Sequence, residues 1–62
     1  MTAYILVTQN TSDLRTAMDN FDGTELVASQ STFICWHWVN PAPADLSSAQ
    51  ALTGYIGTVQ IS

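Results

Sequence analysis

The stretch Thr32-Phe33-Ile34-Cys35-Trp36-His37-Trp38-Val39 carries the strongest structural signal in the chain and decides the predicted fold. Aromatic and β-branched residues dominate it, and these residue types favour a pleated, half-buried strand. Successive side chains of a strand point to opposite faces of its sheet. The alternation therefore predicts two faces for this strand, with Ile34, Trp36 and Trp38 on one and Phe33, Cys35, His37 and Val39 on the other.

A strand and a helix are predicted upstream of this stretch. Residues 2–8 are β-branched and apolar on both faces, which is typical of a buried strand. Thr11 and Ser12 are candidate N-cap residues for a helix. Gly23 is its expected stop signal. The apolar stripe of this helix recurs at positions i, i+3, i+4 and i+7, which are Leu14, Ala17, Met18 and Phe21.

The remaining elements complete an α+β order. Residues 24–28 predict a short strand. Asp45 is the expected cap of a helix from Leu46 to about Leu52. Alternation from Tyr55 to Ile61 predicts a terminal strand. The order β-α-β-β-α-β within one domain, residues 1–62, is the ferredoxin-like, split-βαβ arrangement. It predicts a four-stranded antiparallel sheet with both helices on one face and with residues 2–8 and 32–39 in its centre. Without the short strand at 24–28, a three-stranded sheet with helices on one side would remain.

Charge is scarce in this chain, and the scarcity excludes several functions. Only 10% of the 62 residues are charged, against about 25% in ordinary domains, and Arg15 is the sole Lys or Arg in a chain of net charge -4. One cation cannot neutralise a nucleic-acid backbone or hold an anionic membrane surface, so we expect neither as a direct partner. The apolar run that ends at Val7 is far shorter than a membrane-spanning helix, and no secretory signal precedes it. Cys35 is single, so no internal disulfide forms, and we expect a cytoplasmic protein.

Trp36 and Trp38 share one face of the predicted strand and allow two interpretations. Buried, they supply the bulk that the core of a small domain needs. Exposed on an open sheet face, they are candidate partner-binding residues, because Trp dominates the energetics of protein interfaces. Stacking on RNA bases is disfavoured, because the modules that do this combine their aromatics with cations, which this chain lacks.

Cys35 and His37 are the residues best suited to chemistry, but their spacing argues against it. Same-face neighbours on a strand lie roughly 6.5–7 Å apart. That separation is well beyond the roughly 2.6–3.2 Å between a nucleophile and its base. No further Cys or His completes a metal site. The sequence therefore predicts no catalytic residue, no metal and no cofactor, and we do not expect an enzyme.

Four of the five acidic residues are concentrated on the first predicted helix and the turn after it: Asp13, Asp19, Asp22 and Glu25. They are either a solvated face that keeps the protein soluble or an anionic ridge that occupies a basic groove of a partner. Asp19 and Asp22 are helix-surface neighbours if the helix reaches Asp22, and they lie near its negative end, where carboxylates disfavour folding. No Lys or Arg offsets these carboxylates. Their unfavourable placement therefore favours the interpretation that they serve to bind a partner.

In its size, acidity, lack of catalytic residues and compact α/β pattern, the chain resembles the small phage-encoded anti-CRISPR proteins that mimic DNA. The resemblance implies a non-enzymatic inhibitor that occupies the DNA-binding site of a basic nucleic-acid-binding protein, such as a CRISPR effector subunit. The acidic residues would stand in for phosphates, with Trp36 and Trp38 as anchors beside them. The alternative is a small structural or regulatory module that forms a homodimer or joins a larger assembly through its sheet face or edge. We expect the chain to be a monomer or a homodimer and, if a phage encodes it, to act in the cytoplasm of the host cell.

Overall fold

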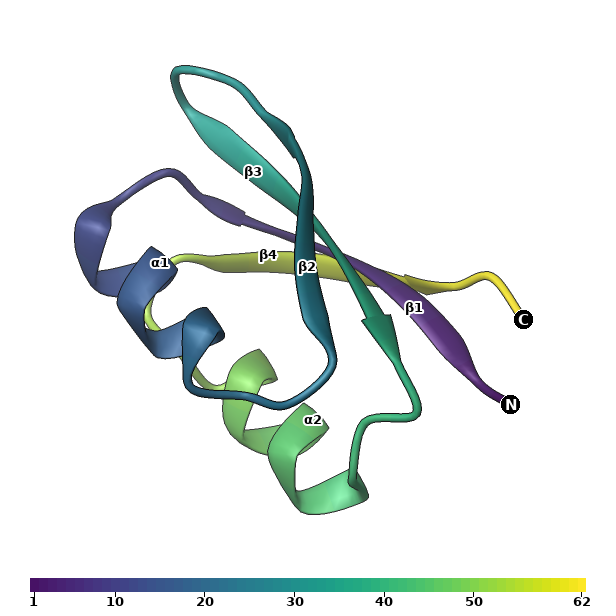
Figure 1. Ribbon diagram of the computed structural model, residues 1–62. Helices are drawn as coiled ribbons and strands as arrows, with labels where there is room; N and C mark the ends of the chain where they lie inside the picture. Colours follow the sequence, from purple (N-terminus) through teal and green to yellow (C-terminus); the bar gives the residue numbers. More distant parts are fainter.

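The computed structural model describes all 62 residues and confirms the predicted order of elements. The strands are β1 (Ala3–Gln9), β2 (Thr24–Ser29), β3 (Phe33–Val39) and β4 (Tyr55–Gln60), and the helices are α1 (Ser12–Asp19) and α2 (Pro43–Gln50). The strands form one antiparallel sheet in the order β2-β3-β1-β4, with β3 and β1 in the centre as predicted. Both helices cover the same face of this sheet, which leaves the opposite face open (Figure 1).

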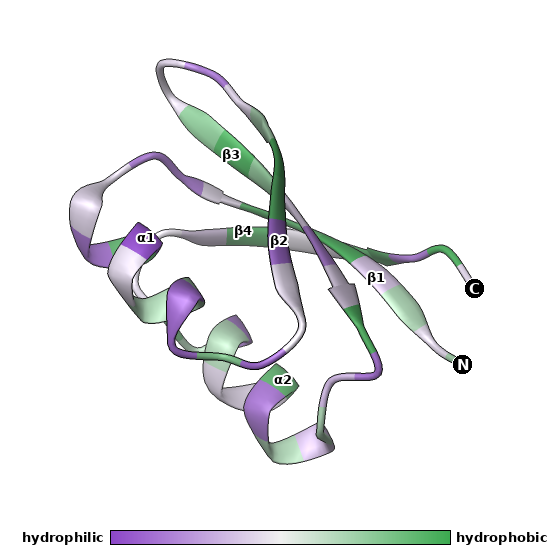
Figure 2. Ribbon diagram, viewed as in Figure 1, coloured by the Kyte–Doolittle hydropathy of each residue, from purple (hydrophilic) through white to green (hydrophobic).

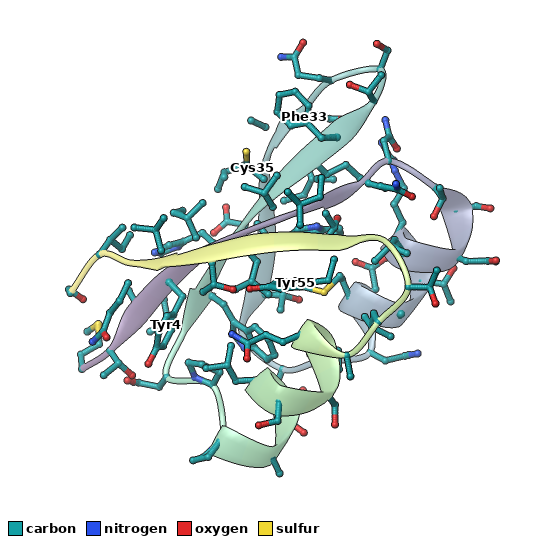
Figure 3. All side chains as sticks on the ribbon, turned by 180° about the vertical axis from the view of Figure 1, so that it is seen from behind. Tyr4, Phe33, Cys35 and Tyr55 are labelled. Atoms are coloured by element: carbon teal, nitrogen blue, oxygen red, sulfur yellow. The ribbon has the colours of Figure 1, made fainter.

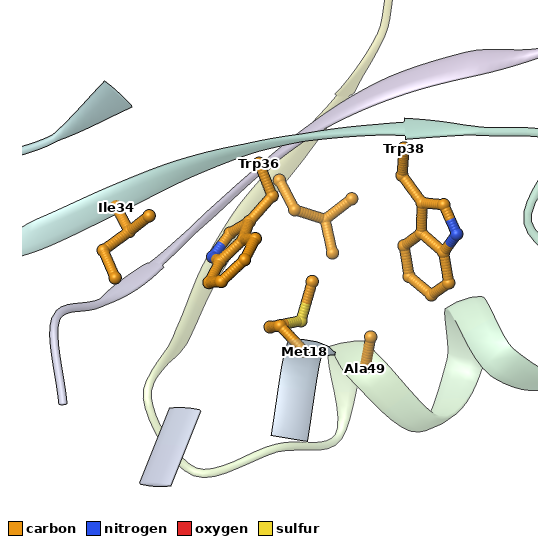
Figure 4. Close-up of a cluster of buried hydrophobic side chains, with 6 residues drawn as sticks. Met18, Ile34, Trp36, Trp38 and Ala49 are labelled. Carbon is orange, nitrogen blue, oxygen red and sulfur yellow. The ribbon is translucent and has the colours of Figure 1, made fainter. Parts of the chain in front are cut away.

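The register of the two central strands decides which side chains face the helices. Leu6 of β1 lies opposite Trp36 of β3, and Tyr4 lies opposite Trp38. Residues opposite each other in an antiparallel pair project to the same face, so this side of both strands points into the core. Figure 4 shows the side chains of β3 meeting those of the two helices. The buried cluster consists of Leu6, Met18, Ile34, Trp36, Trp38 and Ala49.

Each indole N–H in the core has a hydrogen-bond acceptor. Trp36 Nε1 donates to Thr8 Oγ1 at 2.9 Å, and both residues are only 1% exposed. Trp38 Nε1 donates to the carbonyl oxygen of Asp22 at 2.8 Å. Phe21 packs against Trp38 with their ring centroids 5.1 Å apart. A buried donor without a partner is destabilising. Because both indole N–H groups have acceptors, two Trp residues can fill this small core without that penalty.

Helix α1 begins where the sequence predicts. Thr11 is the N-cap, and its Oγ1 accepts a hydrogen bond from the Leu14 backbone N–H at 3.2 Å. The helix ends at Asp19, so Asp22 lies in the turn beyond it and the two are not neighbours on the helix surface. Gly23 then adopts a φ of +86°, a left-handed conformation that glycine adopts without steric strain.

Helix α2 begins three residues earlier than predicted. Its first residue is Pro43 and its N-cap is Ala42, so the expectation of a helix from Leu46 capped by Asp45 is wrong. Proline suits the first helical position, because its N–H would have no intrahelical partner there and its φ is already helical. Asp45 lies in the first turn instead, where its carboxylate faces the positive end of the helix dipole.

Both edge strands of the sheet carry an irregularity. The register of β2 against β3 shifts between Leu26 and Ala28, and the register of β4 against β1 shifts between Val7 and Thr8. The strict alternation predicted over residues 55–61 is therefore interrupted near its start. Bulges twist an edge strand away from straight pairing, so they hinder addition of a further strand at either edge.

Candidate functional site

The face of the sheet that lies away from both helices is largely apolar. Figure 3 shows Phe33 and Cys35 on this side, whereas Tyr4 and Tyr55 lie on the helix side. In β4, Val59 pairs with Ile5 of β1 and therefore shares this face. The open face, as we use the term, consists of the outward side chains of Ala3, Ile5, Val7, Gln9, Glu25, Ala28, Phe33, Cys35, His37, Val39, Val59 and Ile61.

Large apolar side chains on the open face are accessible to solvent. Phe33 is 39% exposed, Val59 62% and Ile61 52%. The rest of the apolar set is half-buried between neighbouring strands: Ile5, Val7 and Val39. A sheet with one solvated face normally places polar residues on that face. The strands carry hydrophobic segments (Figure 2), and the register places apolar residues of β1, β3 and β4 on the open face, which makes this face the strongest candidate for an interaction surface.

The open face is also poor in charge. Glu25 of β2 and His37 of β3 are register partners on this face, with Glu25 exposed and His37 half-buried. Cys35, the free thiol, is half-buried on the same face of β3. Every other Asp, Glu, Lys or Arg side chain belongs to the two helices or to the turn that follows α1.

The structure divides the predicted acidic ridge between two faces. Asp13 and Asp19 lie on α1 and Asp22 in the turn after it, and all three are exposed on the helix side. Glu25 points to the open face, because it lies directly opposite His37 in the sheet. The expectation that all four acids form one ridge is therefore wrong, since strand alternation turns Glu25 to the other side of the sheet.

The helix layer, by which we mean α1, α2 and residues 20–23, carries most of the negative charge: Asp13, Asp19, Asp22 and Asp45. Arg15 does not offset it by pairing with one of these carboxylates. Its Nε donates to Asn10 Oδ1 and its Nη2 to Ser29 Oγ, both at 3.1 Å. The sole guanidinium thus ties α1 to neutral groups next to β1 and at the end of β2, and the helix layer stays acidic.

Trp36 and Trp38 do not belong to any accessible surface. They are 1% and 0% exposed and point toward the helices, so their predicted role as partner-binding residues is corrected to a role in the core. Alternation correctly placed both indoles on one face but left open which face the helices cover. The open face presents Phe33 and Val59 in their place. Phe33 belongs to the face of β3 opposite to the two Trp residues, and Val59 lies in β4.

No three His, Cys, Asp or Glu side chains come together as a metal site would need, and the surface has no pocket. Cys35 and His37 share the open face as predicted, two positions apart on β3, without a hydrogen bond between them. What the arrangement provides is a surface and not a cavity.

None of the helices has the length and apolar character needed to cross a membrane. Comparisons of the chain with protein-family models, curated proteins and solved structures find no significant match.

Proposed function

We propose that this chain is a small interaction module that buries the open face of its sheet against another protein surface. The observation that carries the proposal is the accessible apolar set on that face, with Phe33, Val59 and Ile61 at 39%, 62% and 52% exposure. Soluble monomers rarely expose contiguous apolar surface of this kind unless a partner covers it. Burial of these side chains would be the main driving force for association.

The small core supports the same proposal. Only nine of the 62 residues are buried, and the single cysteine gives no internal disulfide. Domains of this size generally need a further source of stability, such as a disulfide, a metal or a partner. Covering the open face would add a second apolar layer, on the side of β1 and β3 that faces away from the helices.

The single thiol makes the proposal testable in cell extract. Cys35 lies on central strand β3, so a partner on the open face would shield it from a small alkylating reagent such as iodoacetamide. We expect alkylation in extract of the native cells to be several-fold slower than in dilute buffer, read by mass spectrometry of the chain. The buffer reference is taken at a dilution beyond which the rate no longer rises, so that any complex has dissociated, and an equal rate in extract would contradict the proposal.

Two aspartate variants supply the controls for this experiment. Val59→Asp places a carboxylate on the open face at a side chain that is already 62% exposed, so the core is untouched. Ala44→Asp adds the same charge to the exposed surface of α2. The proposal expects Val59→Asp to restore fast alkylation and Ala44→Asp to leave it slow.

The acidic helix layer supports a second candidate function, inhibition of the anti-CRISPR type. The favouring observation is that Asp13, Asp19 and Asp22 are exposed on one side while Arg15 bonds to neutral groups. Such a layer would compete with DNA for a basic surface, with a strength that falls as salt rises. We expect the chain to weaken DNA binding by a CRISPR effector in a gel-shift assay and the Asp19→Lys, Asp22→Lys variant to lose this effect. Undiminished DNA binding at high chain concentration would argue against inhibition.

A further inference from the structure

The distribution of charge over the two faces indicates what kind of surface the open face accepts. Two copies of a chain with net charge -4 repel each other unless their acidic groups stay apart. Four of the five carboxylates lie on the helix layer, and the fifth, that of Glu25, lies beside His37. Two open faces can therefore meet while the acidic layers point in opposite directions. A strongly basic partner would find little on this face to pair with.

One broad side of the molecule is large enough for a dimer interface of standard size. The molecule measures 31 × 19 × 16 Å and exposes 3728 Å² in total. One broad face of a body with these dimensions is about a fifth of its surface, or about 750 Å², close to the ~800 Å² that each partner buries in an interface of standard size.

The sheet edges are less suited to self-association than the face. Both β2 and β4 carry a register shift, and bulged edge strands resist the continuous pairing that strand addition requires. Sheets that pack face to face instead interdigitate side chains across a gap of about 10 Å. Apolar residues at alternate positions along β1, β3 and β4 suit this second mode.

We propose that the partner of the open face is a second copy of this chain, in a two-fold symmetric dimer whose sheets stack and whose helices face outward. The inference rests on the proposed function and specifies its partner. In a two-fold interface the same patch serves both subunits, so an apolar, charge-poor face is its own complement. The resulting four-layer assembly covers Cys35 and leaves the acidic helix layers on its two outer surfaces.

Sedimentation velocity of the purified chain from low micromolar to millimolar concentration tests the dimer. We expect a species of twice the 6.7 kDa chain mass to grow with concentration. Alkylation of Cys35 should slow in parallel. Val59→Asp buries an unpaired carboxylate on each side of the interface and should weaken the dimer by about 100-fold or more, whereas Ala44→Asp should leave it within a few-fold.

The outcomes separate this inference from the proposed function. A monomer at every concentration overturns the dimer, and slow Cys35 alkylation in cell extract would then still support a docking face with a different partner. A dimer that survives Val59→Asp unchanged overturns the assignment of the interface to the open face. Fast alkylation both in concentrated pure protein and in extract overturns both proposals. The circular dichroism spectrum of Val59→Asp is compared with that of the wild type. An unchanged spectrum shows that the variant has lost the dimer and not the fold.

Discussion

The hydrogen bond between Trp36 and Thr8 gives the sharpest test of how the core is built. Thr8→Val replaces the hydroxyl by a methyl group of nearly the same shape, so it opens no cavity, and valine favours strands at least as well as threonine. It removes the acceptor of the Trp36 indole N–H, 2.9 Å away between two residues that are each 1% exposed. It also removes the weaker bond, 3.2 Å long, that the Thr8 hydroxyl donates to the Gln9 carbonyl oxygen.

The structure sets the expected magnitude. A buried donor left without a partner costs about 1–3 kcal/mol. For a domain of roughly this size each kcal/mol lowers Tm by about 4–8 °C, so the melting temperature of Thr8→Val should fall by roughly 10 °C. The loss should appear in urea denaturation as a lower midpoint with an unchanged m-value. Protein concentration must be held fixed, because any dimer contributes to apparent stability.

A double-mutant cycle isolates the hydrogen bond from the rest of the site. Trp36→Phe removes the indole N–H, so in that background Thr8→Val leaves no unsatisfied donor and should cost only the weak bond from the Thr8 hydroxyl to the Gln9 carbonyl oxygen. The coupling between the two positions is then at least about 1 kcal/mol. If Thr8→Val destabilises both backgrounds equally, or costs less than about 0.5 kcal/mol in the wild type, the hydrogen bond does not stabilise the core as argued.

Three further predictions concern the N-cap of α1 and the backbone conformation at two glycines. Thr11→Ala removes the side chain that accepts from the Leu14 backbone N–H and should cost ~1 kcal/mol in urea denaturation, while Thr16→Ala on the exposed side of the same helix should be neutral or slightly stabilising. Gly23→Ala forces a side chain into a φ of +86° with its Cβ 3.0 Å from a backbone oxygen, so thermal melting should show a loss of at least ~1–2 kcal/mol. Gly57→Ala, which meets nothing within 4 Å, is the matched comparison and should melt within a few degrees of wild type.

The fold was predictable from the sequence because its signals are local and agree with one another. Alternation along residues 32–39, the Thr11 cap and the helical stripe that follows each predict one element, and the β-α-β-β-α-β order admits few topologies. The predicted start of α2 was wrong, because Asp45 is a common capping residue, whereas Pro43, two residues earlier, is equally characteristic of a first helical turn. The register shifts in β2 and β4 arise from pairing between strands, which a single strand's sequence does not encode.

The candidate site was predictable only in part. A period of two places Trp36 and Trp38 together, yet both faces of β3 are apolar, so the pattern alone cannot tell which one the helices cover. Glu25 was grouped with Asp22 because they are close in sequence, and only its pairing with His37 shows that it lies on the opposite face. The one sequence pattern that could have indicated the open face is the alternation of apolar residues in the terminal strand, at Val59 and Ile61.

The alkylation rate of Cys35 tests the central claim most directly, because this one thiol reports whether the open face is covered. The rate in native cell extract is compared with that of the same chain in dilute buffer, with the urea-unfolded chain as the reference for full accessibility. We expect a several-fold slower reaction in extract, which Val59→Asp abolishes and Ala44→Asp preserves. Alkylation of the wild-type chain in extract as fast as that of folded Val59→Asp would contradict the proposal that the open face is covered.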